Sequence, residues 1–435
     1  MAPPLIARSS ILTALQRAIN VGYLGIEESG VIYHFGCLKK GASHVYITVL
    51  KDSFWTRVFL RGDLGFSEAY IFGDIKLDSD NLEGVMNLWL ENESGMACLT
   101  SVFKRFCSAL SGLTNALFGQ TLIQARLNVV ASYDQSNELF KAFLSKDLMF
   151  SCALWSDEEG GVQGDLVPRL GRHDVDLEKA QLRKIHHILR KARVKPGQRI
   201  LEIGSGWGAL AIEAARTYGC EVDTLTLSIG QKKLADERIR DAGLQDYVRV
   251  HLTDYREIPF DYENKFDTFI SIEMLEHVGP KYYKTYFKIM DKALKSTNAT
   301  AVVTCSTFPE LRYSGCQAED FMRKYIWPNS CLPSATVLIS AVNTASQGRF
   351  TLEGVENHSS HYPRTLREWD KRFVENVTPE VLAKDFPCVA GNPAAFEAFR
   401  KKWRYLFAYA GAGMARGYLT CHMLTFIRAG DRPLE

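Results

Sequence analysis

The sequence predicts an α/β protein whose larger part is a doubly wound parallel sheet. Strand-like apolar runs and amphipathic helical runs alternate from about residue 199 to residue 304, which is typical of such sheets. The first strand-like run, Arg199 to Ile203, leads directly into a glycine-rich turn at Gly204 to Gly208. The chain has 435 residues, more than one hydrophobic core usually supports, so we expect two domains.

The overall composition excludes several classes of protein. With 46% hydrophobic and 23% charged residues the chain resembles an ordinary globular protein, and a net charge of +2 gives no strong attraction to nucleic acid. The 10 cysteines include no C-x-x-C pair, so neither a metal site nor a disulfide framework is indicated. No apolar run approaches the roughly 18 residues of a membrane span, and no secretory leader is recognisable. We therefore expect a cytoplasmic protein whose contacts with membranes are peripheral.

The first 140 residues or so are expected to form the smaller, mixed α/β domain. A lipid-binding role and a dimerisation role both fit such an accessory domain, so a homodimer is one expected assembly. Apolar periodicity predicts helices at residues 11–19, 82–90 and about 100–127, a turn with a short helix at 61–74, and strands at 31–35, 45–50 and 55–60.

Residues 141–435 are expected to form the second, larger domain. An insertion at about 308–345 interrupts its alternation of strands and helices. The basic residues of the helix at 177–194, among them Lys184, are interpreted as a solvated face. The predicted strands are residues 199–203, 220–227, 247–252, 266–272, 299–304, 350–355 and about 418–426, and the predicted helices are 177–194, 209–215, 229–242, 281–295, 365–376 and 394–414.

Ligands of doubly wound sheets bind beyond the carboxyl ends of the strands, which selects the candidate site. The G-x-G-x-G spacing after the first strand suits S-adenosylmethionine (SAM) better than a dinucleotide. An acid often holds the ribose at the end of the second strand, but here Thr226 takes that place, with Ser228 and Gln231 beyond it. The residues that follow the strands are Gly204–Gly208, Thr226–Gln231, Asp254–Arg256, Glu273–His277 and Thr304–Thr307.

Seven sequence blocks together point to a known family. They are Asp63–Tyr70, Ser151–Ala153, Leu201–Gly208, Thr224–Gln231, Ser271–Gly279, Asp320–Pro328 and His361–Leu366. In this order and spacing the chain resembles the cyclopropane-fatty-acyl-phospholipid synthases and the mycolic acid cyclopropane synthases, most closely their fungal-type members. The resemblance runs from about residue 63 to residue 428. It implies the class I, Rossmann-like fold of SAM-dependent methyltransferases.

The resemblance also implies a reaction and residues that perform it. In this family the π bond of an unsaturated acyl chain attacks the SAM methyl group, and a base then removes a proton from the new methyl to close a cyclopropane ring. The base is taken to be a bound bicarbonate ion, and the positions that match its cradle are Cys152, Glu276, Tyr362 and, after the fifth strand, Thr304. The matching SAM contacts are Phe150, Ser151, Gly204, Gly206, Thr226, Gln231, Tyr255 and Arg256.

Thr304 departs from the family pattern. Bacterial members place His there and many eukaryotic relatives Gln, whereas threonine can hydrogen-bond an anion but reaches less far and carries no charge. Ring closure and quenching of the cation to a branched methyl product therefore both stay open. Aromatic residues of the insertion, Tyr313, Tyr325 and Trp327, are candidates for lining the cation site or for ordinary packing. Arg364 fits either a surface ion pair or a contact to an acceptor headgroup.

Three functions remain to be compared. The first is a SAM-dependent C-methyltransferase that alkylates the double bond of an unsaturated (phospho)lipid acyl chain, giving a cyclopropane or a methyl or methylene branch. The second uses the same chemistry on a small natural-product alkene such as a polyketide or terpenoid. The third is a catalytically inactive scaffold that binds lipid or SAM. The intact glycine turn, Gln231 and Glu276 argue against the third.

Overall fold

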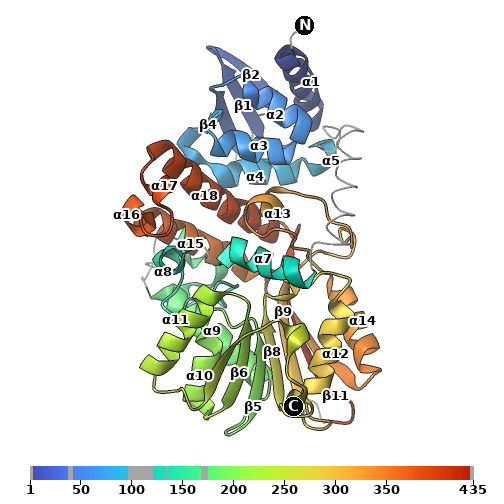
Figure 1. Ribbon diagram of the computed structural model, residues 1–435. Helices are drawn as coiled ribbons and strands as arrows, with labels where there is room; N and C mark the ends of the chain where they lie inside the picture. The colour runs from blue at the N-terminus through green and yellow to red at the C-terminus, as the bar shows by residue number, and fades with distance from the viewer. Residues whose placement is uncertain (1–2, 38–42, 97–120, 134–135, 168–174, 432–435) are drawn as a thin grey trace. The chain divides into compact units, whose positions relative to one another are not determined.

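The computed structural model describes residues 3–37, 43–96, 121–133, 136–167 and 175–431 (Figure 1). The chain divides into two compact units, neither of which is contiguous in sequence. The predicted boundary near residue 140 is not the division between these units, and the accessory role of the first 140 residues stays a prediction. Unit 1 comprises Met1–Leu113, Ala318–Ile326 and Thr378–Arg416, and unit 2 comprises Thr114–Gln317, Trp327–Val377 and Gly417–Glu435.

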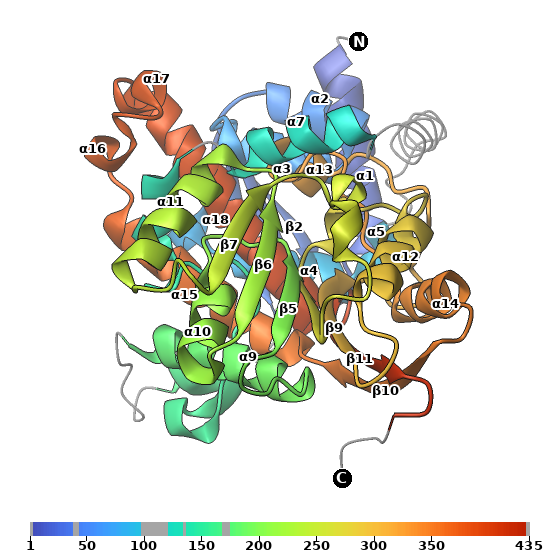
Figure 2. The same ribbon diagram turned by 60° about the horizontal axis from the view of Figure 1, so that its bottom comes forward.

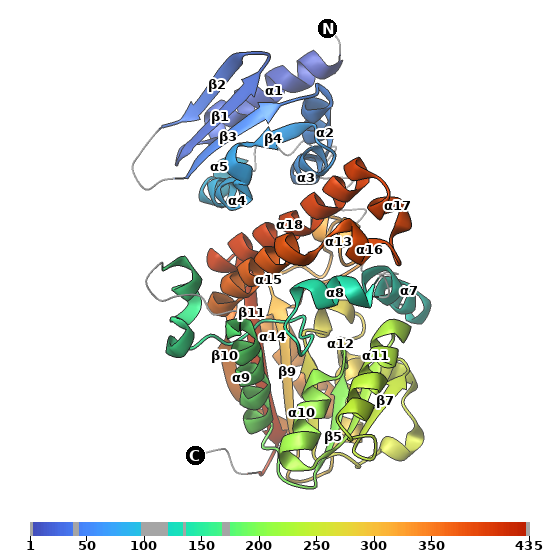
Figure 3. The same ribbon diagram turned by 90° about the vertical axis from the view of Figure 1, so that its left-hand side faces the viewer.

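Unit 1 contains a four-stranded sheet in the order β2-β1-β3-β4. Strand β1 pairs antiparallel with β2 and parallel with β3. Figure 3 shows the strands side by side, with α3 and α4 on one side of them. The strands are β1 (Tyr23–Glu28), β2 (Val31–Gly36), β3 (His44–Val49) and β4 (Ile75–Leu77), and the helices are α1 (Pro3–Ala18), α2 (Ser53–Arg61), α3 (Asp63–Ile71), α4 (Leu82–Glu91), α5 (Glu93–Met96), α13 (Phe321–Tyr325), α16 (Pro379–Leu382), α17 (Pro387–Ala390) and α18 (Pro393–Ala415).

One predicted strand of unit 1 is wrong. Residues 55–60 belong to α2, although their aromatic and β-branched side chains favour strands. Tertiary contacts decide the matter, because Trp55 is buried and its Nε1 donates to Glu28 Oε1 at 2.7 Å. A Cβ on Gly65 of α3 would lie 2.1 Å from the carbonyl oxygen of Arg57, so α2 and α3 touch through their backbones. Most of the helix predicted at about 100–127 lies outside the described residues.

Unit 2 is built on a seven-stranded sheet in the order β10-β11-β9-β8-β5-β6-β7. Strands β5 to β9 are mutually parallel, and β11 runs antiparallel between β9 and β10. The order reverses between β5 and β8, which confirms the predicted doubly wound sheet. The strands are β5 (Arg199–Ile203), β6 (Glu221–Thr226), β7 (Val248–Leu252), β8 (Thr268–Ile272), β9 (Thr300–Thr307), β10 (Phe350–Asn357) and β11 (Thr420–Arg428).

Helices cover both faces of this sheet (Figure 1; Figure 2). One face carries α9 (Asp176–Lys191), α10 (Ala209–Tyr218) and α11 (Ile229–Asp241), and the other carries α12 (Tyr283–Ala293) and α14 (Ala335–Ser346). Alternate residues of β5 point into different clusters, since Ile200 joins the core under α10 while Leu201 joins the core under α12. Burial on both faces explains why these strands are continuously apolar in sequence.

Three further helices of unit 2 lie beyond the carboxyl ends of the parallel strands (Figure 1; Figure 3). They are α7 (Leu122–Tyr133), α8 (Asn137–Phe143) and α15 (Tyr362–Asn376). Because ligands of such sheets bind at this edge, these helices enclose the region where the site is expected.

Among the described residues, no helix combines the length and apolar character needed to cross a bilayer.

Candidate functional site

The glycine-rich turn after β5 forms one wall of the candidate site. Gly204, Gly206 and Gly208 have φ angles of 95°, 48° and 84°, all in the region that favours glycine. A Cβ on Gly208 would lie 3.3 Å from Ala235 of α11, whereas a Cβ on Gly206 would meet no atom within 4 Å. Gly208 thus permits close packing of α10 against α11, and Gly206 leaves space for a ligand to approach the backbone.

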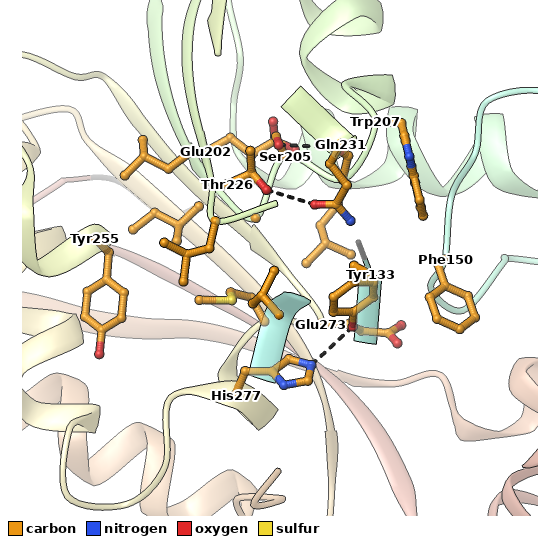
Figure 4. A pocket seen from close by; sticks show the side chains of 18 of the residues that line it. Tyr133, Phe150, Glu202, Ser205, Trp207, Thr226, Gln231, Tyr255, Glu273 and His277 are labelled. Atoms are coloured by element: carbon orange, nitrogen blue, oxygen red, sulfur yellow. Dashed lines mark hydrogen bonds between the residues drawn. The ribbon is translucent and has the colours of Figure 1, made fainter. Parts of the chain in front are cut away.

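A cavity of about 140 Å³ adjoins this turn (Figure 4). Residues that follow β5, β6, β7 and β8 line it, together with α7 and the segment before α9. All of the predicted SAM contacts except Ser228 line the cavity, namely Phe150, Ser151, Gly204, Gly206, Thr226, Gln231, Tyr255 and Arg256. The structure therefore brings together residues that are more than 100 positions apart in the sequence.

Ser228 supports the site from outside the cavity lining. Its hydroxyl accepts from the backbone N–H of Gln231 at 2.9 Å, which caps the start of α11. The Thr226 hydroxyl donates to Gln231 Oε1 at 2.8 Å, so the orientation of the Gln231 amide is fixed (Figure 4). Because no acidic residue follows β6, the side chains of Thr226 and Gln231 provide the hydrogen-bonding groups at the place where a ribose is expected.

Glu202 belongs to the cavity wall but is absent from the predicted site residues. It is the penultimate residue of β5, and its carboxyl accepts from the Thr224 hydroxyl at 2.6 Å. Burial raises the pKa of Glu202 to about 8, since a charged carboxylate is poorly solvated there. Its position two residues before Gly204 is the sequence signal that marks it.

The residues after β7 form a rigid corner of the cavity. Arg256 donates to both carboxylate oxygens of Asp254, from Nε at 2.7 Å and from Nη2 at 2.8 Å. Its guanidinium also lies 5.2 Å from the ring centroid of Tyr255 and 5.0 Å from that of Tyr282. Such a bidentate and stacked arginine holds the Tyr255 ring at the cavity wall.

The segment before α9 brings Phe150 and Ser151 to the opposite wall. The Phe150 ring lies 5.4 Å from Phe140 and 5.1 Å from Trp369 between centroids. Ser151 is held from behind by α9, because the Lys184 ammonium donates to its hydroxyl at 2.5 Å. The interpretation of Lys184 as part of a solvated face is therefore wrong: its side chain is buried, and burial lowers its pKa to about 8.

Two of the predicted catalytic residues, Tyr362 and Cys152, hydrogen-bond to Glu273, which is not among the predicted site residues. The Tyr362 hydroxyl donates to Glu273 Oε2 at 2.5 Å, and the backbone N–H of Cys152 donates to Glu273 Oε1 at 2.7 Å. Glu273 lines the cavity, whereas Tyr362 and Cys152 do not. The signal for it was its place directly after β8, in the same block as Glu276.

Glu276 and Thr304 lie deeper than Glu273. Glu276 Oε1 accepts from the backbone N–H of Ser306 at 2.5 Å, and Glu276 Oε2 and Thr304 Oγ1 have no hydrogen-bond partner among the described residues. Burial, with Glu273 as a second cause, raises the pKa of Glu276 to about 8. The catalytic roles predicted for Glu276, Thr304, Tyr362 and Cys152 stay predictions.

The His277 imidazole, which lines the cavity, is neutral at physiological pH. Burial lowers the pKa of His277 to about 4, and its Nε2 lies 3.2 Å from the hydroxyl of Tyr133 (Figure 4). A neutral imidazole adds no positive charge to the cavity, which suits a cationic ligand. The remaining candidates are dispersed: Tyr325 belongs to unit 1 and donates to Glu68, and Trp327 lies 6.0 Å from Phe150.

Arg364 has neither of the roles considered for it from the sequence. Its side chain is 1% exposed, and its Nη1 donates to the carbonyl oxygens of Glu159 and Gly161 at 2.6 and 2.5 Å. Its guanidinium lies 4.0 Å from the Trp155 ring centroid. Arg364 therefore anchors the loop before α9 inside the protein.

The cavity residues fit SAM. The turn at Gly206 admits close backbone approach, Thr226 and Gln231 offer polar groups for hydroxyls, and aromatic rings and the Glu273 carboxylate attract a sulfonium ion.

Glu202 gives rise to a pH dependence of stability. An unfolded glutamate titrates near 4.3, so between about pH 4.3 and pH 8 the folded state binds more protons than the unfolded state. The free energy of unfolding contributed by this group is fully present below the lower value and is lost as pH rises through the upper one. Glu202→Gln cannot titrate, and its Tm should therefore fall less than that of the wild type between about pH 6 and pH 8.5.

Glu178→Gln is the matched control, because hydrogen bonds and ion pairing with Arg372 outweigh burial and lower the pKa of Glu178, away from this pH range. The Tm of this control variant should fall by about as much as that of the wild type across the same pH range. Parallel Tm profiles of the wild type and Glu202→Gln would contradict the assignment of a protonated Glu202.

Comparison with known proteins agrees with this site. The model of the mycolic acid cyclopropane synthetase family matches residues 120–388, more than half of the chain. The cyclopropane-fatty-acyl-phospholipid synthase of Escherichia coli K12 is 32% identical over 385 residues, which make up 88% of this chain and 87% of that protein. The tuberculostearic acid methyltransferase of Mycobacterium tuberculosis H37Rv is 32% identical over 308 residues, 71% of this chain and 66% of that protein.

Among solved structures, the cyclopropane synthase MmaA2 of Mycobacterium tuberculosis has a similar fold, with a TM-score of 0.56 and 23% identity. The likeness covers 69% of this chain and 97% of that chain. The family match and the relatives confirm the predicted resemblance to the cyclopropane synthases, the fold class and SAM as the cofactor, while the fungal-type assignment stays a prediction. This chain belongs to the mycolic acid cyclopropane synthetase family and is a SAM-dependent methyltransferase.

Proposed function

We propose that this chain transfers the methyl group of SAM to a carbon–carbon double bond of an unsaturated lipid acyl chain, giving a cyclopropane or a methyl or methylene branch. The observation that carries the proposal is a carboxylate, Glu273, facing a SAM-type cavity whose other walls are mainly apolar and aromatic. Alkylation of an alkene creates a carbocation, which needs negative charge nearby and exclusion of water.

The aromatic rings of the cavity wall can stabilise such a cation. The rings of Tyr133, Phe150 and Trp207 line the cavity (Figure 4), and each aromatic face attracts a cation by roughly 0.5–2 kcal/mol. Trp207 is fixed by a hydrogen bond from its Nε1 to Asn137 Oδ1 at 2.8 Å. The Coulomb attraction of a carboxylate is strongest where the protein replaces water.

The choice of a lipid acceptor is supported by the relatives. The Escherichia coli relative is named for a fatty acyl phospholipid and the Mycobacterium tuberculosis relative for tuberculostearic acid. A phospholipid acceptor resides in a bilayer, so this proposal includes peripheral association with a membrane surface. A homodimer formed through the N-terminal region is part of the same proposal.

The acceptor is tested by incubating the purified protein with SAM labelled on its methyl group and vesicles of dioleoyl phospholipid. We expect label in the acyl chains, whose structure is then assigned by NMR, because a ring and a methylene branch have the same mass. Vesicles of the saturated dipalmitoyl lipid are the matched control and should stay unlabelled. Labelling of free terpenoid or polyketide alkenes but not of vesicles would favour a small-molecule acceptor. A protein that binds SAM and labels none of these would contradict the proposed activity.

Gly206 tests the placement of SAM. Gly206→Ala puts a Cβ into the open space beside the turn, so we expect the Kd for SAM to rise at least about 10-fold, equivalent to about 1.4 kcal/mol. Gly219→Ala is the matched control: Gly219 has a φ of 61° and open space around its Cβ position but does not line the cavity. Both variants should lose about 1–2 kcal/mol of stability from a left-handed alanine. Titration calorimetry should show weaker SAM binding only for Gly206→Ala, and equal affinities in the two variants would place SAM elsewhere.

A further inference from the structure

The hydrogen-bond donors that should hold a bicarbonate ion are already engaged. Tyr362 and Cys152 occupy the cradle positions implied by the family resemblance. The Tyr362 hydroxyl donates to one carboxylate oxygen of Glu273, and the Cys152 N–H donates to the other. A bicarbonate at this place would lose these two donors and would lie against the Glu273 carboxylate, with Glu276 nearby. The residues present therefore do not fit a bound bicarbonate.

From this arrangement we propose that the Glu273 carboxylate is itself the base that removes the proton from the alkylated acceptor, in place of a bound anion. The proposal rests on the proposed function and names a further catalytic residue for it. Glu273 lines the cavity, whereas Glu276, Tyr362, Cys152 and Thr304 do not. Of the two glutamates in this block, Glu273 is the one that a reacting carbon in the cavity can reach.

The backbone at position 273 supports a functional role. Glu273 has a φ of 48°, a left-handed conformation that costs a non-glycine residue about 1–2 kcal/mol. The conformation is fixed because the Glu273 N–H donates to the carbonyl oxygen of Thr304 at 2.8 Å. A glycine would adopt this conformation without strain, so the carboxylate is retained at a cost in stability. Strain of this kind concentrates at functional sites.

Hydrogen bonds favour the charged form at Glu273 more than at Glu276. Enclosure by the protein raises the pKa of both carboxyl groups. Two hydrogen bonds and the nearby Lys184 ammonium oppose this effect at Glu273, whereas Glu276 Oε2 lacks a hydrogen-bond partner among the described residues. These contacts favour the charged form of Glu273 over the charged form of Glu276.

The proposed step balances without any further reactant. The alkene π electrons form a bond to the methyl carbon of SAM as the methyl–sulfur bond breaks, and the neighbouring alkene carbon becomes cationic. Glu273 then accepts a proton from the new methyl group, and the electron pair of that C–H bond closes the three-membered ring. If a hydride first shifts from the methylated carbon to the neighbouring cationic carbon, the cation lies on the carbon that bears the methyl group, and loss of a methyl proton to Glu273 then gives a methylene branch. In both cases the products are the alkylated lipid, S-adenosylhomocysteine and a protonated Glu273, which releases its proton to water.

Two substitutions separate this role from a structural one. Glu273→Gly removes the carboxylate, suits the left-handed backbone and frees the donors of Tyr362 and Cys152. Glu273→Gln keeps the shape of the side chain but cannot accept the proton as a carboxylate does. In buffer depleted of carbon dioxide, the wild type should keep its rate on unsaturated vesicles, and both variants should lose about 100-fold or more, the lower end of general-base catalysis.

Added bicarbonate supplies the decisive readout. We expect it to restore turnover at least about 10-fold in Glu273→Gly, where an external base can now occupy the site, and to restore none in Glu273→Gln. Bicarbonate should likewise raise the Tm of Glu273→Gly, against chloride at equal pH and ionic strength, without raising that of the wild type. A wild type that needs bicarbonate, or a Glu273→Gln enzyme with near wild-type turnover, would overturn the proposal.

The melting measurements keep this proposal separate from the proposed function. A wild-type protein that alkylates no acceptor would end the proposed function. The Tm comparison would still decide whether the Glu273 carboxylate occupies the position where bicarbonate would bind. A rise in the wild-type Tm with bicarbonate would show that this position is open to the ion, whatever the activity.

Discussion

A carboxylate that lines a largely apolar cavity needs hydrogen-bond donors from the protein, and in unit 2 Glu273 is such a carboxylate. Its two oxygens accept from Cys152, in the loop before α9, and from Tyr362, at the start of α15. The same loop is tied to α9 by Lys184 through Ser151. Segments about 120 and 90 residues away from Glu273 in sequence are thus joined at one side chain, so the shape of the cavity wall depends on this charge being satisfied.

The parallel sheet makes that convergence possible. Strands β5 to β8 end at one edge, and the residues that follow them carry the groups that line the cavity. The glycine turn after β5 removes side chains where a ligand approaches, while the turns after β6 and β7 fix an amide and a guanidinium by local hydrogen bonds. The site therefore combines one permissive wall with two rigid ones, an arrangement that positions a ligand at little entropic cost.

Periodicity predicted most of the unit 2 strands and helices, because burial on both sheet faces leaves a strong apolar pattern in the sequence. It failed at residues 55–60, where strand-forming side chains lie in a helix that is decided by contacts to β1 and α3. Most residues predicted to contact SAM line the cavity because they follow the strands directly, whereas Phe150 and Ser151 were indicated only by the family resemblance. Lys184 was interpreted as solvated and Glu273 was not singled out, since a basic residue on an amphipathic helix and a second glutamate in one block look ordinary until the fold shows what each one touches. Arg364 is a similar case, because its burial depends on the loop at 159–161.

A base carried by the chain differs from a bound ion in one respect that bears on the product. An ion diffuses into its cradle and adjusts to the acceptor, whereas the Glu273 carboxylate is fixed by its backbone and by two donors. Which proton it removes is then set by the position of the acceptor relative to one fixed point. In the proposed reaction, ring closure follows if the new methyl group lies next to the carboxylate while the neighbouring carbon is cationic, and a methylene branch follows if a hydride shift first moves the cation to the carbon that bears the methyl group. In the proposed reaction, the shape of the cavity around the alkene therefore selects the product.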